Sequence, residues 1–410
     1  MLRVQKYGGS SVASADHIKR VALRVAKERE AGDDLVVVVS AMGQTTNQLI
    51  DLSRSISHNP APREMDLLLS TGELVSGALL AMALRDLGHG AVSLSGFQAG
   101  IRTDTDFSRA RITQIEPKRL QDEIGRGNIV IVAGFQGTTD DFEVTTLGRG
   151  GSDTTAVALA AELRAPVCEI YTDVDGIYTA DPRIVPDARR LIDINYDEML
   201  EMASEGARVM HNRAVELGWV YDVPILVASS LLDDSGGTRI HGGELMENRN
   251  KVRGIAHDAG IARVTLLGVP DRPGIAAQVF SPLADAGISV DIIVQNAGQH
   301  GLSDLSFTVT RDDLPETLER TREIQAELGA ADVTADDHLA KVSIVGAGLT
   351  NSPGYAGAMF RALRDANVNI EMITTAEISL TCVVHQDHVE DAVRALHRAF
   401  SLETPDDIPL

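Results

Sequence analysis

Two glycine-rich turns hold the residues of this 410-residue chain that are best suited to bind an anion. The first turn follows a short apolar run at the N-terminus and reads Lys6, Tyr7, Gly8, Gly9, Ser10. Adjacent glycines let the backbone come close to a phosphate, the amides that follow can donate to its oxygens, and the lysine adds positive charge. Because the lysine precedes the glycines, the order differs from that of a P-loop. The pattern predicts a phosphate-binding turn between a strand and a helix.

The second turn, residues 146–153, precedes a helical pattern over 154–163 and brings a guanidinium, Arg149, next to a carboxylate, Asp153. Three more polar clusters follow apolar runs or open helices, at residues 40–47, 70–73 and 172–183. Taken singly, each cluster is more typical of a turn, a helix cap or a surface ion pair. Two basic glycine turns in one sheet favour a common cause, and a bound phosphoanhydride is such a cause.

A largely parallel sheet is expected to position these clusters. Compact β-branched runs alternate with helical patterns, at residues 35–39, 91–94, 129–133, 167–171 and 224–227. Strands that are apolar on both faces and separated by helices indicate a sheet covered on both sides. Ligands of such folds lie at the carboxyl ends of the strands, where the polar clusters occur.

The last third of the chain contains an internal repeat. Pro273 recurs as Pro353 and Phe280 as Phe360, a constant offset of 80 residues. Each copy is expected to read strand, turn, helix, strand, strand, helix, so the pattern predicts a small α+β module present twice.

The charge balance limits the partners. With 37 basic and 59 acidic residues the net charge is −22, which disfavours nucleic acid and anionic membrane surfaces. The only cysteines, Cys168 and Cys382, lie far apart in apolar runs and suggest neither a disulfide framework nor a thiolate metal site. The expected compartment is the cytoplasm.

Five strings in order, KYGGSS, SAMGQTTN, STGE, TTLGRGGSD and YTDVDGIYTADPR, resemble those of the aspartate kinases, and the repeat resembles a pair of ACT domains. The resemblance implies an α/β amino-acid-kinase fold, an αβα sandwich with a mainly parallel sheet, followed by two ferredoxin-like ACT domains. The implied division is a catalytic domain over 1–248, a linker over 249–262, and ACT domains over 263–338 and 339–410. The resemblance also allows an arrangement in which the second ACT domain is inserted into the first and the C-terminal strand returns to complete the first domain.

The implied reaction is transfer of the γ-phosphate of Mg-ATP to the β-carboxylate of L-aspartate, the first step toward lysine, threonine and methionine. Lys6 matches the residue that stabilises the transferring phosphoryl group, and Asp153 matches an acid that holds either this lysine or the magnesium environment. Mg²⁺ itself is expected to be held mainly by the ATP phosphates. The implied substrate contacts are Ser40, Thr46, Glu73, Arg149 and Ser152. The implied ATP contacts are Lys6, Tyr7, Gly8, Gly9, Ser10, Thr172, Asp173, Tyr178 and Arg183.

Two alternatives stay open at this point. One is a kinase of the same fold that acts on glutamate, N-acetylglutamate or a nucleoside monophosphate. The other is a non-catalytic amino-acid sensor that keeps the fold only to bind a ligand. The string STGE and the paired modules favour aspartate, and the joint presence of Lys6, Glu73, Arg149 and Asp153 favours an enzyme.

The resemblance also implies feedback control by lysine, threonine or both, bound by the ACT modules. The matching effector residues are Asp271, Ala276, Gln295, Asn296, Ala376 and Glu377. Gly298 and Ala376 stand where family strings carry serine, and the loss of two hydroxyls predicts weakened feedback. A homo-oligomer formed through the ACT modules is expected, and a hetero-oligomer with a shorter regulatory subunit is allowed.

Overall fold

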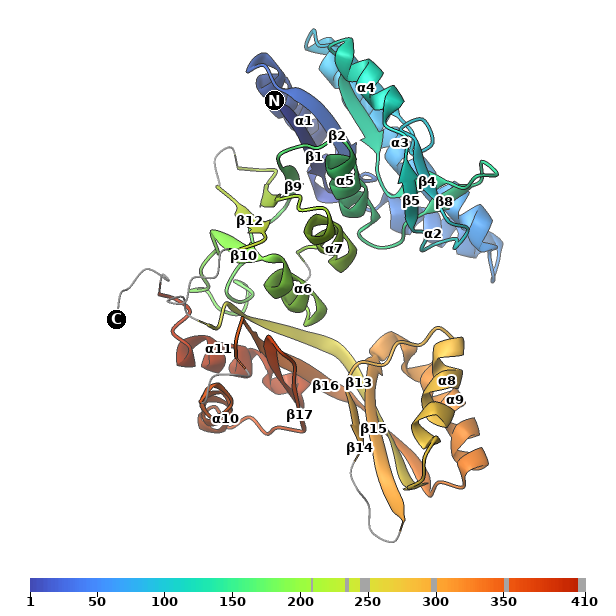
Figure 1. The fold of residues 1–410 in the computed structure, drawn as a ribbon, viewed down its shortest axis with the longest axis vertical. Helices are drawn as coiled ribbons and strands as arrows, with labels where there is room; N and C mark the ends of the chain where they lie inside the picture. The colour runs from blue at the N-terminus through green and yellow to red at the C-terminus, as the bar shows by residue number, and fades with distance from the viewer. Residues whose placement is uncertain (208, 233–235, 244–250, 296–300, 350–353, 405–410) are drawn as a thin grey trace. The chain divides into compact units, whose positions relative to one another are not determined.

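The computed structural model describes the chain except for residues 208, 233–235, 244–250, 296–300, 350–353 and 405–410. The chain forms two compact units (Figure 1). Unit 1 comprises Met1–Tyr178, Arg190–Ser204 and Arg208–Glu247, and unit 2 comprises Thr179–Arg189, Glu205–Ala207 and Asn248–Leu410. The expected division at residue 248 assigned two short segments, 179–189 and 205–207, to the catalytic domain, whereas the structure includes them in unit 2.

Unit 1 is built on an eight-stranded sheet in the order β10-β12-β11-β9-β1-β2-β6-β3. All its neighbouring strands run parallel except β11 and β12, so the predicted mainly parallel sheet is confirmed. The strands are β1 (Leu2–Tyr7), β2 (Asp34–Val39), β3 (Ala91–Leu94), β6 (Ile129–Ala133), β9 (Cys168–Thr172), β10 (Asp193–Asn195), β11 (Ile225–Ser229) and β12 (Thr238–His241).

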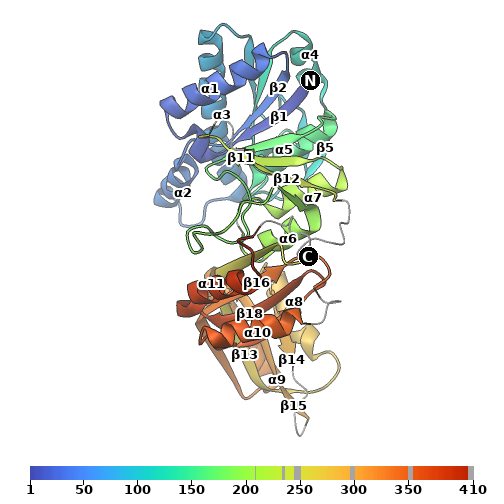
Figure 2. The same cartoon turned by 90° about the vertical axis from the view of Figure 1, so that its left-hand side faces the viewer.

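Helices cover both faces of this sheet (Figure 2). The strand residues Leu35 and Val37 pack with α1 (Ala15–Glu30) and α3 (Pro62–Asp86), because alternate residues of a strand point to one face. Helix α5 (Gly151–Glu162) packs against β1, β2 and β9. The other helices of unit 1 are η1 (Gly9–Val12), α2 (Thr45–Ile56), α4 (Lys118–Gly125), α6 (Tyr196–Ser204) and α7 (Asn212–Val220). A second sheet, in the order β5-β4-β7-β8, contains β4 (Ile101–Thr103), β5 (Ile112–Ile115), β7 (Gln136–Thr138) and β8 (Val144–Thr146).

Helix α3 is long and apolar enough to span a membrane if length and composition alone are considered. In the structure it packs against α1, β3, β6 and β8, and two of its carboxylates, Asp66 and Glu73, are buried in unit 1. Core helices of folded domains pass the same length and composition test. On α3, Leu80 and Leu84 are fully buried, whereas Leu67, Val75 and Met82 are 42%, 52% and 60% exposed.

Unit 2 contains one six-stranded sheet in the order β14-β15-β13-β16-β18-β17. Its elements are β13 (Gly254–Pro270), α8 (Ile275–Asp285), β14 (Ile293–Gln295), β15 (Leu302–Thr310), η2 (Arg311–Asp313), α9 (Leu314–Leu328), β16 (Asp332–Val345), α10 (Tyr355–Asp365), β17 (Met372–Thr375), β18 (Ser379–His385), η3 (Gln386–His388) and α11 (Val389–Ala399). The glycines before α8 and α10, Gly274 and Gly354, both adopt positive φ, 96° and 112°. The predicted repeat is thus present in the turn chemistry as well as in the order of elements.

The two modules share their central strands. The far half of β13 pairs with the first residues of β16, from Arg263–Asp336 to Leu267–Asp332, and completes the first module. The near half of β13 pairs with the far half of β16, from Gly254–Val345 to Asp258–Lys341, and completes the second module. The strand that closes the second module therefore precedes the first module. The return of a C-terminal strand to the first module, which the resemblance allowed, is not seen among the described residues: α11 is the last regular element described, and residues 405–410 lie outside them.

The segment 179–189 is built into the second module. Ala180 and Val185 belong to its apolar core, together with residues of β16, β18, α10 and α11. The Ile255 amide donates to the Thr179 carbonyl at 2.7 Å, and the Arg394 guanidinium donates to the Ile184 carbonyl at 3.0 Å. Ala180 and Val185 therefore add to the core of the module, whereas the Arg183 side chain between them is 88% exposed.

We expect Leu283→Ala to lower the free energy of unfolding of unit 2 by about 2–5 kcal/mol, because Leu283 is fully buried in the core of the first module. Ile373→Ala is the matched control in the same unit, since Ile373 is 47% exposed, and its effect should stay below about 1 kcal/mol. Urea unfolding followed by far-UV circular dichroism measures both. Equal effects of the two variants would contradict the assigned core.

Candidate active site

A buried ion pair lies where β1 ends and α5 begins. The Lys6 ammonium is 2.6 Å from Oδ1 of Asp153, and their side chains are 11% and 12% exposed. Lys6 is the penultimate residue of β1 and Asp153 lies in the first turn of α5. The sequence identified both residues, and the structure brings them together.

The first glycine turn is shaped around this lysine. A side-chain carbon at Gly8 would lie 3.4 Å from the Lys6 ammonium, and one at Gly9 would lie 2.9 Å from the Ala41 carbonyl oxygen. The Gly8 amide donates to the Tyr171 carbonyl at 3.1 Å, so it is already engaged. Gly9 and exposed Ser10 open the short helix η1, and the first amides of a helix have no acceptor within it. The amides of this turn that remain available to an anion are therefore those of Gly9 and Ser10.

The Tyr7 side chain faces away from the turn. Its ring is fully buried and stacks on Tyr171 with centroids 5.0 Å apart. Of the predicted ATP contacts, Tyr7 can therefore offer only its main chain.

Glu73, on α3, is linked to the glycine turn by Ala41, which contacts both. One carboxylate oxygen accepts from the Ala41 amide at 3.1 Å, and the Ala41 carbonyl lies against Gly9. The other carboxylate oxygen is buried and has no hydrogen-bond partner. Burial disfavours the charged form and raises the pKa of Glu73 to about 7, although the Ala41 amide opposes the shift. Glu73 thus presents an unsatisfied acceptor that a bound cation would complete.

Ser40 directly follows β2, Thr46 lies in the first turn of α2, and Ser152 precedes Asp153 in α5. The Ser40 amide donates to the Tyr7 carbonyl at 3.1 Å, and its carbonyl accepts from Ser76. Thr46 is partly exposed in the first turn of α2. Ser152 is buried beside Gly134, where a side-chain carbon would meet it at 2.9 Å.

The second glycine turn presents Arg149 to solvent. We call residues 147–150 the substrate loop, because Arg149 is a predicted substrate contact. Gly148 and Gly150 adopt positive φ, 76° and 67°, a conformation that favours glycine. A side chain at Gly150 would overlap the ring of His211. Arg213, at the start of α7, donates to the carbonyls of Leu147 at 2.5 Å and Ala110 at 2.9 Å. The loop is therefore fixed by two residues of another segment.

His211 and Arg213 were missed by the sequence reasoning, because neither belongs to a local motif. Burial lowers the pKa of His211, even though Asp153 opposes the shift, so its imidazole is neutral near pH 7. Its Nδ1 atom is buried and has no hydrogen-bond partner. Asp66 was also missed: its carboxylate accepts from the amides of Ser108 and Thr146, at 2.9 and 2.7 Å, and fixes β8 ahead of the loop. Asp66 had no distinctive signal in the sequence, because the same helix also carries Arg63, Glu64 and Glu73.

The predicted nucleotide segment is divided between the units. Thr172, Asp173 and Tyr178 belong to unit 1, where the Thr172 hydroxyl donates to Asp173 at 3.0 Å and the Tyr178 hydroxyl to Asp175 at 2.8 Å. Arg183 belongs to unit 2 and pairs with Asp181 at 2.7 Å. The structure does not bring Arg183 into the same unit as the other nucleotide candidates.

The predicted effector residues fall at two places in unit 2. Asp271 donates its amide to Gly301 at 2.8 Å and Gln295 donates to Ser303 at 3.3 Å, which places both at one end of the first module. Exposed Ala276 lies at the start of α8. Exposed Ala376 and Glu377 lie in the turn between β17 and β18. Asn296 and Gly298 lie outside the described residues.

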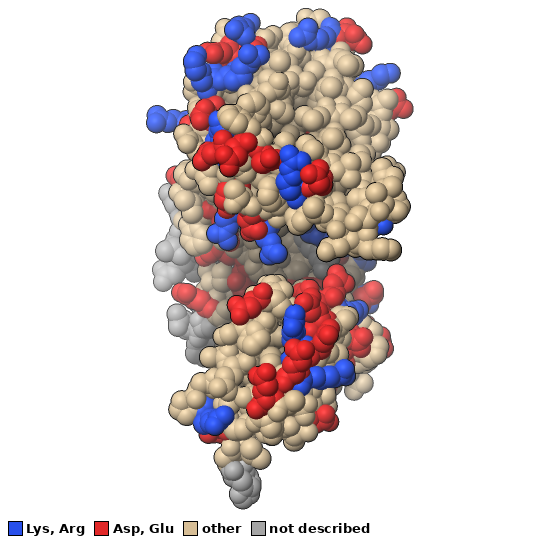
Figure 3. All heavy atoms as spheres, turned by 90° about the vertical axis from the view of Figure 1, so that its right-hand side faces the viewer, with Lys and Arg blue, Asp and Glu red and all other residues tan. Residues whose placement is uncertain are grey.

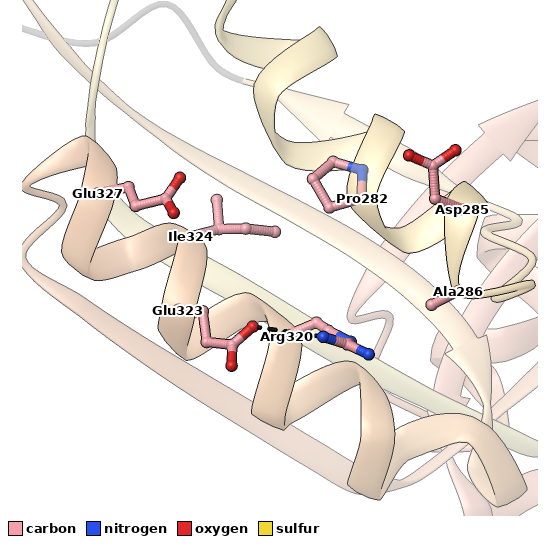
Figure 4. A pocket seen from close by; sticks show the side chains of 7 residues that line it. All are labelled: Pro282, Asp285, Ala286, Arg320, Glu323, Ile324 and Glu327. Carbon is pink, nitrogen blue, oxygen red and sulfur yellow. Dashed lines mark ion pairs between the residues drawn. The ribbon is translucent and has the colours of Figure 1, made fainter.

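A separate cavity of about 330 Å³ lies between α8 and α9 (Figure 4). Its lining is Pro282, Asp285, Ala286, Arg320, Glu323, Ile324 and Glu327, which includes none of the predicted site residues. Acidic side chains gather on the face of unit 2 that Figure 3 presents, with few basic ones between them. This surface is unsuited to an anionic ligand. Within the described ranges no group of three or more His, Cys, Asp and Glu side chains could hold a metal ion.

Comparison with known proteins agrees with this architecture. The amino acid kinase family model matches residues 1–229, and ACT domain models match residues 263–325 and 342–400. An aspartokinase of Mycolicibacterium smegmatis is 49% identical over 411 residues, covering 99% of this chain and 97% of that protein. An aspartokinase of Geobacillus stearothermophilus is 49% identical over 399 residues and covers 97% of each chain.

The chain belongs to the aspartokinase family. The predicted resemblance and the amino-acid-kinase fold with two ACT domains are thereby confirmed. Among solved structures, E. coli aspartokinase III in complex with aspartate and ADP superposes with a TM-score of 0.82 at 29% identity, covering 97% of this chain and 99% of that one. The same enzyme in complex with lysine and aspartate gives a TM-score of 0.76 at 28% identity, with the same two coverages.

The raised pKa of Glu73 predicts that the stability of this chain depends on pH. Between pH 4.5 and 7 the folded chain retains a proton on Glu73 that the unfolded chain releases, so the free energy of unfolding falls as pH rises. Glu73→Gln has no carboxyl group at this position, so its free energy of unfolding does not fall in this way. Its stability relative to the parent should therefore rise by about 3 kcal/mol over that interval.

Urea unfolding of unit 1, followed by fluorescence of the single tryptophan, Trp219, measures the difference at each pH. Glu64→Gln, at an exposed position on the same helix, serves as the control and should show no such trend. A flat difference for Glu73→Gln would mean that the carboxyl titrates normally.

Proposed function

We propose that this chain is an ATP- and Mg²⁺-dependent kinase that converts L-aspartate to 4-phospho-L-aspartate. The observation that carries the proposal is the buried Lys6–Asp153 pair beside the glycine turn, with the unsatisfied Glu73 oxygen on the other side of Ala41. One part offers positive charge and amides to a phosphate, and the other offers a carboxylate to an amino group. The relative solved with aspartate and ADP supports this pair of ligands.

In the reaction, a β-carboxylate oxygen of aspartate forms a bond to the γ-phosphorus while the bond to the β,γ-bridging oxygen breaks and ADP leaves. A carboxylate with a pKa near 4 needs no general base at neutral pH, so the protein contributes position and charge. Lys6 stabilises the negative charge on the transferring group, and Asp153 holds the ammonium in place. The Gly9 and Ser10 amides bind phosphate oxygens.

The magnesium ion fits this donor set. Mg²⁺ is usually held by one or two carboxylates together with substrate phosphates, and Asp153 is one carboxylate beside the phosphate turn. When bound, the ion neutralises charge on the β- and γ-phosphates. Asp153 alone would hold it from the protein side, and the nucleotide segment at Thr172, Asp173 and Tyr178 would bind adenosine.

Aspartate is held by opposite charges at its two ends. Arg149 presents a planar fork that suits a carboxylate, and the ionised Glu73 suits the α-ammonium. Ser40, Thr46 and Ser152 supply polar contacts between them. Because the protein carries a net charge of −22, a local guanidinium is needed to capture an anionic substrate.

We propose regulation by lysine, threonine or both at the first module, near Asp271, Ala276, Gln295 and Asn296, with Ala376 and Glu377 contributing from the second. The relative solved with lysine and aspartate supports a lysine effector. Glycine at 298 and alanine at 376 each remove a hydroxyl, so inhibition should be weak. The expected setting is the cytoplasm, with chains assembled through their ACT modules.

The test is formation of hydroxylamine-trapped acyl phosphate from L-aspartate and Mg-ATP by the full-length chain. L-Glutamate is the control substrate, and each reaction is repeated with L-lysine, L-threonine or both. We expect hydroxamate from aspartate only, with little inhibition at sub-millimolar effector. Product from glutamate but not aspartate, or no product from folded protein, would reject the proposed substrate.

We expect Lys6→Met to lower kcat by about 10³-fold or more while the chain stays folded, because the charge that stabilises the transferring phosphoryl group is lost. Lys118→Met is the matched control, since Lys118 is 87% exposed on α4. Steady-state kinetics at saturating aspartate and ATP measure the effect. If turnover of Lys6→Met matched that of the control, the role given to Lys6 would be wrong.

A further inference from the structure

The segment between α6 and α7 makes contacts inside both units. Residues 205–207 belong to unit 2, although α6 before them and α7 after them belong to unit 1. We call residues 205–213 the connector; residue 208 lies outside the described residues. Among its described residues, Glu205 and Gly206 contact unit 2, whereas His211, Asn212 and Arg213 contact unit 1. The Asn212 side chain also donates to the hydroxyl of Ser204, the residue before the connector, at 2.8 Å.

The first end of the connector is anchored on the sheet of the second module. One Glu205 carboxylate oxygen accepts from the Ser343 hydroxyl and from the Thr381 hydroxyl, the latter at 3.2 Å, and lies 3.5 Å from the Lys341 ammonium. Ser343 and Thr381 are directly opposite each other on β16 and β18. The Lys341 side chain is only 5% exposed and also pairs with Asp291 of the first module at 3.0 Å. Burial alone would lower the pKa of Lys341, but the two carboxylates outweigh it and raise the pKa, so the cation is retained.

A glycine fixes the path of the connector at this end. Gly206 has φ of +116°, and a side chain there would overlap the His257 carbonyl on β13. The backbone of the connector therefore lies directly against the strand that closes the second module, which leaves it little freedom to shift without moving β13.

The other end of the connector holds the substrate loop. His211 packs against Gly150, where no side chain could be accommodated, and Arg213 donates a hydrogen bond to the carbonyl of Leu147. These contacts define the conformation of the residues on either side of Arg149. Only five residues separate Gly206 from Asn212, the first residue of α7.

We propose that the connector is a positioning segment through which the sheet of unit 2 sets the conformation of the substrate loop. Glu205 anchors the connector to unit 2, and His211 and Arg213 contact the substrate loop. The kinetic part of this proposal rests on the proposed function, because it assumes that the loop binds aspartate. A change that frees Glu205 should loosen the loop and weaken aspartate binding, while nucleotide binding is little affected.

The test is hydrogen exchange, followed by mass spectrometry, of the peptide that covers residues 147–150 in the full-length chain. Glu205→Gln removes the charge that faces Lys341 and should speed exchange of this peptide about fivefold. Glu371→Gln is the matched control: it makes the same charge change in unit 2, where Glu371 lies 3.6 Å from Arg263, and should leave the peptide unchanged. Ser343→Ala removes one donor to Glu205 without changing any charge and should act in the same direction more weakly, so it decides the matter if Glu205→Gln does not fold.

Kinetics supply a readout that general destabilisation would not give. We expect Glu205→Gln to raise the KM for aspartate about fivefold, with the KM for ATP within about twofold of the parent. Equal exchange in Glu205→Gln and Glu371→Gln, or faster exchange spread evenly over unit 1, would overturn the proposal. If the parent chain makes no aspartyl phosphate, the proposed function fails, whereas the exchange result still decides the role of the connector.

Discussion

The buried ion pair between Lys6 and Asp153 is the constraint on which the rest of the site depends. Removing two charges from water is costly, and a pair left half-formed would cost several kcal/mol, so β1 and α5 must hold both groups in place. The glycine turn beside the pair leaves no room for a side chain at Gly9, where a side-chain carbon would lie 2.9 Å from the Ala41 carbonyl oxygen. Since Ala41 also donates to the Glu73 carboxylate, one short stretch of backbone fixes the spacing between the phosphate donors and the acceptor for an amino group.

Sequence reasoning found those site residues that belong to local motifs. Lys6 and Asp153 stand at a strand end and in a first helical turn, where parallel sheets place ligands, so their approach could be expected. Alternation along β1 also implies that Tyr7 faces away from Lys6, an implication that the motif comparison did not use. His211 and Arg213 could not be found this way. They act on a loop about 60 residues earlier in the chain, through contacts that only the packing of α7 reveals.

The repeat predicted two modules but could not predict how they share strands. An offset of 80 residues matches the parts that recur, whereas residues 254–258 have no second copy to mark them. Strand β13 is 17 residues long and β16 is 14, enough for each to serve both modules. Which half of β13 pairs with which half of β16 is decided by long-range contacts. The same is true of the segment 179–189, whose Ala180 and Val185 enter the core of the second module. Composition and periodicity are local and do not carry that information.

The sharing of strands has a consequence for control. Both segments that unit 2 takes from the earlier chain, 179–189 and 205–207, contact the second module, whereas the predicted effector residues Asp271 and Gln295 belong to the first. Among the ion pairs described in unit 2, Lys341 joins these parts: it pairs with Asp291, four residues before Gln295, and with Glu205. A buried cation stripped of one carboxylate is costly, so a shift of Asp291 is opposed unless Lys341 and Glu205 move with it. A signal that begins in the first module therefore need not cross the whole sheet, because one shared ammonium already couples it to the connector.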